Sequence, residues 1–308
     1  MATVVVPTHN GAAVLGTCLR SVVSQDLPDP YEVVVVDDGS TDDTRSVVEQ
    51  VRAAAARRVA VRYEWQAHLG LNAGRNRGAA LARGALVCLV DDDVEAPPTW
   101  LPALLEGARR HPDALVLGGP IRLRIEGREP RHCRQDRLPE THLDRGPDLV
   151  WDQKLYGANL AFRPSALERA GPFRERMSGH GDEGEWLRRL LSAGGHSLYL
   201  PDAWLWHRRT KDELGLLYLM RRSYRHGWSH VPYLASVGMR PTPLGELVTI
   251  GRGLGHAACF GCFYGILRAC RAAGKLRRIW GAADGDLALP PLSRPSDPAA
   301  TAMPPAPR

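Results

Sequence analysis

The chain has 308 residues, of which 44% are hydrophobic, so it is long enough to bury a sizeable core in one large domain or two small ones. Its net charge is +6, but the arginines are spread over many segments and only 6% of the residues are aromatic. A nucleic-acid-binding protein concentrates basic and stacking side chains on one element, so no nucleic-acid partner is expected. A basic surface suits phosphate-bearing small molecules or an anionic membrane face.

The first residues, Met-Ala-Thr-Val-Val-Val-Pro, have strand character and lack the basic start and cleavage site of a signal peptide. Together with six cysteines, this favours a reducing, cytoplasmic location, with peripheral attachment to the inner face of the cell membrane left open. The longest apolar stretch near the C-terminus, residues 254–267, contains His256 and several glycines. We expect it to be too short and too interrupted to span a membrane.

The first 90 residues alternate between predicted strands and predicted helices. Short runs of Val, Leu and aromatic residues indicate the strands, and apolar residues three and four positions apart indicate the helices. The predicted strands are residues 3–6, 31–36, 59–65 and 85–90, and the predicted helices are residues 12–23, 41–57 and 73–83. Thr41 or Asp42 is expected to cap the second helix. This succession predicts a mostly parallel sheet with right-handed crossovers.

The rest of the chain is predicted to continue this pattern and then to become helical. Further helices are expected at residues 100–110, 183–193 and 214–226, and further strands at residues 114–125, 157–163 and 198–201. A Gly-Gly-Pro sequence interrupts the first of these strands. Residues 127–150 are predicted to form a mobile loop. A helical appendage is expected from about residue 241, and a disordered Pro-rich tail at residues 285–308.

Polar and acidic side chains follow three of the predicted strands. They are Thr8, His9 and Asn10 after the first strand, Asp37 and Asp38 after the second, and Asp91, Asp92 and Asp93 after the fourth. The carboxyl ends of neighbouring parallel strands meet in one crevice, where open α/β proteins bind ligands. Adjacent carboxylates repel one another unless a cation lies between them, so the acidic triplet predicts a site for a hard divalent cation. A solvated acidic turn is the alternative for the triplet alone.

No Gly-rich phosphate-binding loop follows the first strand, in either the G-x-G-x-x-G or the G-x-x-x-x-G-K form. A nucleotide-dependent dehydrogenase or a P-loop enzyme is therefore disfavoured.

Seven sequence blocks, taken together and in order, resemble the family-2 inverting glycosyltransferases. They are Val-Val-Val-Pro-Thr-His-Asn (4–10), Val-Val-Val-Val-Asp-Asp-Gly-Ser-Thr-Asp-Asp-Thr (33–44), Asn-Ala-Gly-Arg-Asn-Arg-Gly (72–78), Leu-Val-Asp-Asp-Asp (89–93), Gly-Ala-Asn-Leu-Ala-Phe-Arg (157–163), Gly-Pro-Phe (171–173) and Gly-Asp-Glu-Gly-Glu-Trp-Leu-Arg-Arg (181–189). Each block is weakly specific, whereas all of them in order over residues 2–210 are strongly specific.

The resemblance implies a GT-A fold, which is a Rossmann-like, mixed but mostly parallel sheet with flanking helices. The catalytic domain would span residues 1–210, with a nucleotide-sugar-binding half at residues 1–118 and an acceptor-binding half at residues 119–210. A C-terminal helical region at residues 211–284 and the disordered tail would follow.

The same resemblance assigns donor-binding roles to several residues. Pro7, Thr8 and His9 would line the nucleobase pocket, with the His9 ring against the base. Asp38 would accept a hydrogen bond from the base or the ribose, and Arg75 would reach the base or the diphosphate. The alternatives are ordinary turn residues for His9 and Asp38 and a surface arginine for Arg75.

The acidic triplet would bind the ribose and the metal ion. Asp91 would hold the ribose or the metal, and Asp93 would bind Mn²⁺ or Mg²⁺ between the two phosphates. Asp92, on the opposite side of the strand, is expected to support the donor site without binding the metal. His207, expected after a short strand, would approach the metal or the diphosphate, with a structural role as its alternative. Arg208–Arg209 would add diphosphate contacts or form a solvated pair.

Asp182 and Glu183 form the second acidic group. Family members usually have Glu-Asp here, and the second residue is the general base that deprotonates the acceptor hydroxyl. The order is reversed in this chain, so Glu183 falls at the base position and the choice between Glu183 and Asp182 stays open. Acids at the start of a helix also stabilise the helix dipole, which is the structural alternative.

The function implied is a metal-dependent glycosyltransferase that inverts the anomeric centre by single displacement. It would move a sugar from a UDP-, GDP- or dTDP-sugar to a hydroxyl or other nucleophile of an unknown acceptor. That acceptor is an anionic or lipid-linked molecule in one hypothesis, and the pathway would make polysaccharide, glycolipid or natural product. The alternatives are a sugar-phosphate nucleotidyltransferase, which would need a Gly-rich pyrophosphate loop, and a non-catalytic nucleotide-sugar-binding protein.

Two further features lie near the C-terminus. The C-terminal helices carry basic residues beside apolar turns, so peripheral membrane contact is an alternative to packing against the catalytic domain. His256, Cys259 and Cys262 are expected on successive turns of one apolar helix, with Cys270 beyond them. Packing cysteines are favoured there over a zinc site, because no second C-x-x-C sequence exists.

Overall fold

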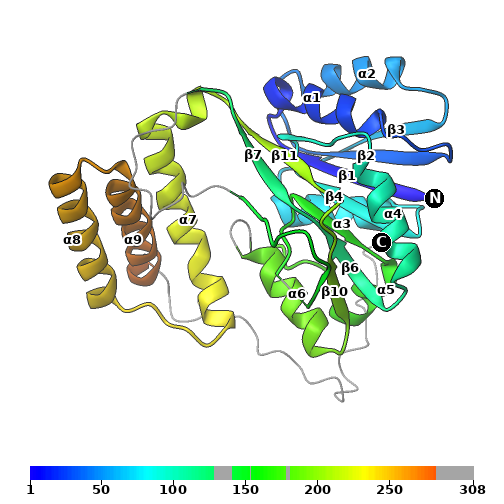
Figure 1. The fold of residues 1–308 in the computed structure, drawn as a ribbon. Helices are drawn as coiled ribbons and strands as arrows, with labels where there is room; N and C mark the ends of the chain where they lie inside the picture. Colours follow the sequence, from blue (N-terminus) through cyan, green and yellow to red (C-terminus); the bar gives the residue numbers. More distant parts are fainter. Residues whose placement is uncertain (128–140, 153, 178–180, 282–308) are drawn as a thin grey trace.

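The computed structural model describes residues 1–127, 141–152, 154–177 and 181–281, and Figure 1 shows their arrangement. The strands are β1 (Ala2–Thr8), β2 (Tyr31–Asp38), β3 (Val59–Gln66), β4 (Leu86–Val90), β5 (Val94–Glu95), β6 (Ala114–Gly118), β7 (Ile121–Ile125), β8 (Val150–Trp151), β9 (Asn159–Phe162), β10 (His196–Tyr199) and β11 (Leu205–Arg209). The helices are α1 (Ala12–Val23), α2 (Thr44–Ala54), α3 (Leu71–Leu81), α4 (Trp100–Arg110), α5 (Pro164–Ala170), α6 (Asp182–Ser192), α7 (Leu216–Ser236), α8 (Pro243–Phe260) and α9 (Phe263–Gly281), and a short 3₁₀ turn, η1, covers Asp212–Leu214.

The strands of the described residues form two sheets. The larger sheet has the order β3-β2-β1-β4-β9-β6-β10-β8, and the smaller has the order β5-β11-β7. Strands β3, β2, β1 and β4 run parallel, and every residue of β2 is buried, as expected for a strand covered on both faces. The predicted α/β class with a mostly parallel sheet, flanking helices and C-terminal helices is therefore confirmed. The predicted domain boundaries stay a prediction.

Helix α3 lies close against β1 because two of its residues are glycines. A Cβ atom at Gly78 would lie 2.1 Å from Cγ1 of Val5, and one at Gly74 would lie 3.2 Å from Cβ of Pro7. On another side of the helix, the Asn76 side chain donates to the carbonyl of Phe173 (2.8 Å) and accepts from its N–H (2.9 Å). The Asn-Ala-Gly-Arg-Asn-Arg-Gly block thus fixes this helix between β1 and the segment before α6.

The predicted strand over residues 114–125 is wrong as a single element. It forms β6 and β7, which belong to different sheets, and the Gly-Gly-Pro sequence is the point where the chain changes sheet. A Cβ atom at Gly119 would lie 2.2 Å from the carbonyl oxygen of Ala203, so the close approach there requires glycine. The start of α2 differs slightly from the prediction, because the helix begins after Asp43, whose side chain makes no capping hydrogen bond. The predicted cap Asp42 still accepts from the N–H of Thr44, the first helical residue, at 3.1 Å.

Helices α7, α8 and α9 stand together beside the sheets (Figure 1). They pack closely at glycines, since a Cβ atom at Gly274 of α9 would lie 2.0 Å from the carbonyl oxygen of Tyr224 in α7. Helix α7 ends at Ser236, ten residues beyond its predicted end at His226, and continues through Pro232. Within the described ranges, none of the helices combines the length and the apolar character that crossing a membrane requires.

The prediction that His256, Cys259 and Cys262 lie on successive turns of one helix is also wrong. Gly261, with φ +60°, ends α8, and α9 begins at Phe263. Cys259 is exposed at the end of α8 and Cys262 is buried in the turn, so the two do not lie on one helix. Most of the predicted loop at residues 127–150, and the predicted tail at residues 285–308, lie outside the described residues.

Candidate active site

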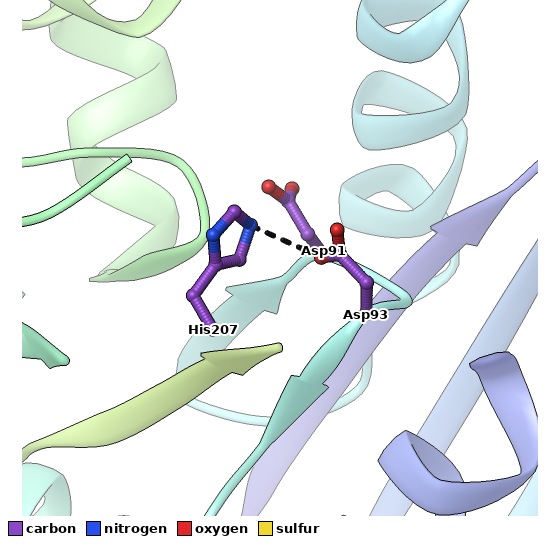
Figure 2. Close-up of side chains that lie close together, drawn as sticks. All are labelled: Asp91, Asp93 and His207. Carbon is purple, nitrogen blue, oxygen red and sulfur yellow. Dashed lines mark ion pairs between the residues drawn. The ribbon is translucent and has the colours of Figure 1, made fainter. Parts of the chain in front are cut away.

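Asp91, Asp93 and His207 come together where β4 ends, β5 begins and β11 lies beside them. The two aspartates lie between β4 and β5, and His207 lies within β11, not after it as predicted. β11 pairs with β5, with His207 opposite Val94, which brings the histidine beside the acidic triplet. One ligand atom from each residue lies within 4.8 Å of the others, and Nε2 of His207 is 3.1 Å from Oδ1 of Asp93 (Figure 2).

The donor atoms of this group fit a divalent cation. Oδ1 of Asp93 is buried and makes no hydrogen bond of good geometry among the described residues, although Nε2 of His207 lies 3.1 Å from it. A metal ion that binds Asp91, Asp93 and His207 would give this oxygen a ligand bond in place of that contact. The described residues hold no other such group of three or more His, Cys, Asp or Glu side chains.

Arg209 is an additional partner of Asp93 and lies buried on β11. Its Nη1 atom donates to Oδ2 of Asp93 at 2.5 Å, and the residue is 1% exposed. Burial alone would raise the pKa of Asp93, but His207 and Arg209 outweigh it and hold that pKa well below its usual range. Arg209 is therefore a buried member of the site, whereas Arg208 pairs with Glu126 at the surface.

Arg75 joins the two acidic groups that lie far apart in the sequence. Its Nη1 atom donates to Oδ2 of Asp182 (2.9 Å), and its Nη2 atom lies 3.7 Å from Oδ1 of Asp91. Arg75 is 3% exposed, and a Cβ atom at Gly157 would lie 2.2 Å from its Nη2 atom. Gly157 therefore leaves the space that the guanidinium occupies. Burial raises the pKa of Asp91 despite the nearby Arg75.

Asp182 and Glu183, in the first turn of α6, differ in how their carboxylates are engaged. Oδ2 of Asp182 accepts from Arg75, and its Oδ1 accepts from the Glu183 backbone N–H (3.0 Å). Among the described residues, no cationic side chain lies within hydrogen-bond distance of the Glu183 carboxylate, although Arg75 attracts its charge from further away. Burial raises the pKa of Glu183 well above its ordinary value, and the negative charge of Asp182 adds to the shift. The ionised carboxylate of Glu183 is thus a stronger base than an ordinary glutamate.

One cavity of about 200 Å³ connects the metal-binding group with the acid pair. Its polar lining includes Asp91, Asp93, Asp182, Glu183, His207, Arg75, Arg209, Tyr156 and Arg222. The structure therefore brings together the carboxylates after β4, the histidine of β11 and the acids of α6. A reacting atom in this cavity would have the metal site and a basic carboxylate as neighbours.

A second cavity of about 270 Å³ adjoins the first, because Leu71, Asp91 and Asp93 line both. The other residues that line it are Pro7, Thr8, His9, Asp38, His68 and Asp92. The rings of His9 and His68 lie 4.1 Å apart between centroids and are tilted by 33° to each other. Thr8 donates to Oδ2 of Asp92 (2.6 Å), and burial raises the pKa of Asp92 to about 7. All the predicted donor residues except Arg75 line this second cavity, whereas Arg75 lines the first.

The Asp38 carboxylate is already saturated with donors from residues 66–70. Oδ1 accepts from the side chain of Gln66 (2.7 Å) and the N–H of Leu69 (2.9 Å). Oδ2 accepts from the N–H of Gly70 (2.8 Å) and lies 2.9 Å from Nδ1 of His68. A carboxylate oxygen offers about two acceptor positions, so Asp38 shapes the wall of this cavity through the loop it holds.

Sequence reasoning missed His68 and Tyr156 and did not place Arg222 in the site. His68 carried a signal, because it follows the carboxyl end of β3 beside the other strand ends. Arg222 carried none, because α7 reaches the cavity only through the packing of the C-terminal helices.

Comparison with solved structures agrees with this fold. Mannosyltransferase PcManGT from Pyrobaculum calidifontis, solved with GDP-Man and Mn²⁺, is 20% identical, with a TM-score of 0.60 over 92% of this chain and 88% of that one. TarS of S. aureus in complex with UDP-GlcNAc is 18% identical, with a TM-score of 0.52 over 91% of this chain and 92% of that one. These are GT-A glycosyltransferases, so the predicted GT-A fold is confirmed.

The sequence identifies the family. Residues 3–170 match the sequence model of Glycosyl transferase family 2, and the chain belongs to this family of transferases. A validoxylamine A glucosyltransferase from Streptomyces hygroscopicus subsp. limoneus is 38% identical over 225 residues, which is 62% of this chain and 48% of the relative. The glycosyltransferase AglE of Haloferax volcanii is 28% identical over 193 residues, 62% of this chain and 61% of that protein. The chain thus spans about half to three fifths of the length of these relatives.

Proposed function

We propose that this protein is a metal-dependent, inverting glycosyltransferase that uses a nucleoside-diphosphate sugar as donor. The observation that carries the proposal is the single cavity lined by Asp91, Asp93 and His207 together with Glu183. A cation site and a basic carboxylate in one cavity are the two groups that transfer from a nucleotide sugar requires.

The donor would occupy both cavities. The nucleobase would pack in the cavity walled by His9 and His68, and Asp91, which lines both cavities, would hold the ribose. Arg75 interacts with both Asp182 and Asp91. Its main role would be to position these two carboxylates, and a contact with the donor diphosphate would come second. Arg209 adds a buried positive charge where the diphosphate would lie.

Asp91, Asp93 and His207 would hold the metal ion. Carboxylates suit both Mg²⁺ and Mn²⁺, but an imidazole ligand is disfavoured by Mg²⁺, which prefers oxygen. We therefore favour Mn²⁺. When bound, the cation neutralises charge on the departing nucleoside diphosphate.

Glu183 would act as the general base. Because Asp182 is held by Arg75 and by the Glu183 N–H, the carboxylate of Glu183 is the one left to take the acceptor proton. Its raised pKa strengthens it as a base. Direct attack by the acceptor, opposite the leaving diphosphate, would invert the anomeric centre.

The sugar and the acceptor are set by side chains that a family resemblance does not define. The named relatives and neighbours favour a hexose donor, since they include a glucosyltransferase, a mannosyltransferase with GDP-Man and a protein bound to UDP-GlcNAc. On the acceptor side, Tyr156 lines the cavity and Nζ of Lys154 lies 5.0 Å from its ring centroid. This cationic edge is compatible with an anionic acceptor.

The test is a donor-hydrolysis screen with UDP-, GDP- and dTDP-sugars in the presence of Mn²⁺, Mg²⁺ or EDTA. We expect at least one donor to be hydrolysed with Mn²⁺ and none with EDTA. Asp93→Asn, which removes the charge but keeps the shape, is expected to abolish the metal-dependent activity. Binding without hydrolysis for every donor would favour the non-catalytic alternative, and no binding at all would contradict the proposal.

A further inference from the structure

A third cavity of about 380 Å³ lies within the C-terminal helices, outside the site described above. Its polar lining includes Ser223 of α7, Glu246 and Thr249 of α8, and Arg268, Arg271 and Lys275 of α9. Its volume falls in the range of about 300–1,000 Å³ that is typical of small-molecule sites. The described residues that line the cavity come from three different helices, which pack against one another at glycines.

Two polar atoms in this cavity are buried and unpaired. Within the part of the chain that the structure describes, Oε2 of Glu246 and Oγ of Ser223 have no hydrogen-bond partner, although these residues are only 7% and 1% exposed. The other oxygen of Glu246 is used, because Oε1 accepts from Nζ of Lys275 at 3.0 Å. Buried polar atoms in folded proteins are almost always paired, so these two indicate that a ligand or water supplies the missing partners.

The cavity also carries an excess of positive charge. Arg268, Arg271 and Lys275 lie on α9 at a spacing that places them along one face, and Glu246 offsets a single charge. The guanidinium of Arg271 is half-buried and makes no hydrogen bond or ion pair with the described residues. Burial lowers the pKa of Arg271, and the nearby Tyr264 and Glu246 offset this only in part. The net excess of two positive charges suits an anionic phosphate, which carries about −1.5 to −2 as a monoester at neutral pH and about −1 as the diester of a phospholipid headgroup.

We propose that this cavity binds a phosphate-bearing polyol, with the phosphate at Arg271, Arg268 and Lys275 and a ligand hydroxyl donating to Glu246. The phosphate supplies the acceptors that Arg271 lacks. A carboxylate oxygen only accepts, so the partner of Oε2 of Glu246 is a donor, and a hydroxyl group next to the phosphate provides it. Ser223 completes the contact as a donor or an acceptor.

Two sources share this chemistry, namely a free sugar or polyol phosphate and the headgroup of an anionic lipid. Helix α8, which contributes Glu246 and Thr249 to the cavity, also exposes large apolar side chains to solvent. They are Leu244, Leu247, Val248, Leu254 and Phe260. An acyl chain would cover such side chains, so the experiment includes a lipid arm.

The experiment uses the full chain in EDTA, to separate this cavity from the metal site. Inorganic phosphate and glycerol 3-phosphate are titrated by calorimetry and by their effect on Tm. Arg271→Gln is expected to weaken the binding of inorganic phosphate and of glycerol 3-phosphate by about tenfold or more, because it removes the central cation. Glu246→Gln is expected to remove the preference for glycerol 3-phosphate over phosphate. Arg252→Gln, an exposed arginine of α8 outside the cavity, is the matched control and should bind as the native chain does.

The lipid arm compares co-sedimentation with vesicles of phosphatidylglycerol in phosphatidylcholine and of phosphatidylcholine alone. If the native chain binds the phosphatidylglycerol vesicles and Arg271→Gln weakens that binding, the ligand is a lipid headgroup. If the chain binds only the soluble probes, the ligand is a free polyol phosphate. If Arg271→Gln does not fold, Arg268→Gln takes its place, with about threefold weaker binding expected. Equal binding by the native chain and the cavity variants, or no binding of any probe, would overturn the proposal. Donor hydrolysis is measured separately and does not depend on this cavity.

Discussion

Glu183 and Asp182 illustrate how two adjacent carboxylates acquire different roles. Asp182 is held by Arg75, whereas Glu183 lies in the same cavity with a raised pKa. We expect Glu183→Gln to keep donor binding and to lower the transfer rate by about 10²- to 10⁴-fold, the usual contribution of a general base. Single-turnover kinetics with a radiolabelled donor, alongside donor affinity by calorimetry, separate the two effects.

Asp182→Asn is the matched control for this substitution. It should disturb the position of Arg75 and so weaken donor binding as well as transfer. The native Glu183 has a folded pKa above its unfolded value, so its contribution to stability is present at low pH and is lost as the pH rises through the folded pKa. Glu183→Gln should therefore not lower Tm at neutral pH. Full transfer activity in this variant would identify Asp182 as the base instead.

The same raised pKa predicts the pH dependence of the reaction. A general base acts in its ionised form, so transfer should rise with pH through the pKa of Glu183. Because that pKa lies well above the ordinary glutamate value, the rise should fall at a correspondingly higher pH. The measurement is the pH profile of kcat/KM at saturating Mn²⁺. A profile that is already flat just above the ordinary pKa of glutamate would contradict it.

The position of His207 leads to a prediction about which metal ion the site prefers. Its imidazole lies within 4.8 Å of ligand atoms of Asp91 and Asp93, so a metal bound there would have one nitrogen ligand. We expect Mn²⁺ to raise Tm more than Mg²⁺ does, because Mg²⁺ favours oxygen ligands. His207→Ala should reduce the stabilisation by Mn²⁺ and narrow the difference between the metals. An unchanged Mn²⁺ response in this variant would remove His207 from the metal site.

At the scale of elements, the contact between α3 and β1 depends on the absence of a side chain. We expect Gly78→Ala to destabilise the protein by about 1–3 kcal/mol, since the new methyl group would overlap with Val5 in a packed core. Gly251→Ala in α8 is the matched control, because no atom lies within 4 Å of the new Cβ. It should stabilise by about 0.4–1 kcal/mol. Urea unfolding measures both, and equal effects would show that α3 moves away from β1 at little cost.

Elements that depend on local pattern were predictable, and those that depend on long-range pairing were not. The Asp91–Asp93 triplet could be placed at a strand end because the apolar run before it is continuous in the sequence. The split of residues 114–125 between two sheets could not, because it depends on β11, which is some 80 residues further on and pairs with both β5 and β7.

In the site, too, residues placed by local sequence pattern were predictable and contacts between distant parts of the chain were not. The positions after predicted strands placed Thr8–Asn10, Asp37–Asp38 and Asp91–Asp93 at one crevice, whereas the roles of Pro7 and Arg75 came from the family resemblance. The pairing of Arg75 with Asp182 joins residues 107 positions apart, and no periodicity indicates such a contact. Asp38 was expected to contact the donor directly, yet its oxygens are occupied by residues 66–70, a result of how that loop closes on β2.

At the scale of the whole molecule, the sheets and the C-terminal helices have separate cores. A large cluster of buried side chains surrounds the main sheet, whereas a small cluster at Leu214, Leu219 and Leu267 joins α7 to α9. Among the residues of α8, only Glu246 and Gly253 are buried. The two parts meet where Tyr233 of α7 packs against the start of α6, so close that a Cβ atom at Gly181 would lie 2.7 Å from its ring.

This division predicts two levels of local stability. Backbone amides of α8 should exchange with solvent at a lower free energy than those of β1, β2 and β4, because local opening costs less where little apolar surface is buried. Hydrogen exchange followed by mass spectrometry measures the difference. Mn²⁺ with UDP or GDP should slow exchange at the end of β4 and in the first turn of α6, where the site residues lie, and leave α8 unchanged. A uniform slowing over all these segments would mean that the helices and the sheets unfold as one unit, and that α7 transmits the state of the catalytic cavity to the C-terminal helices.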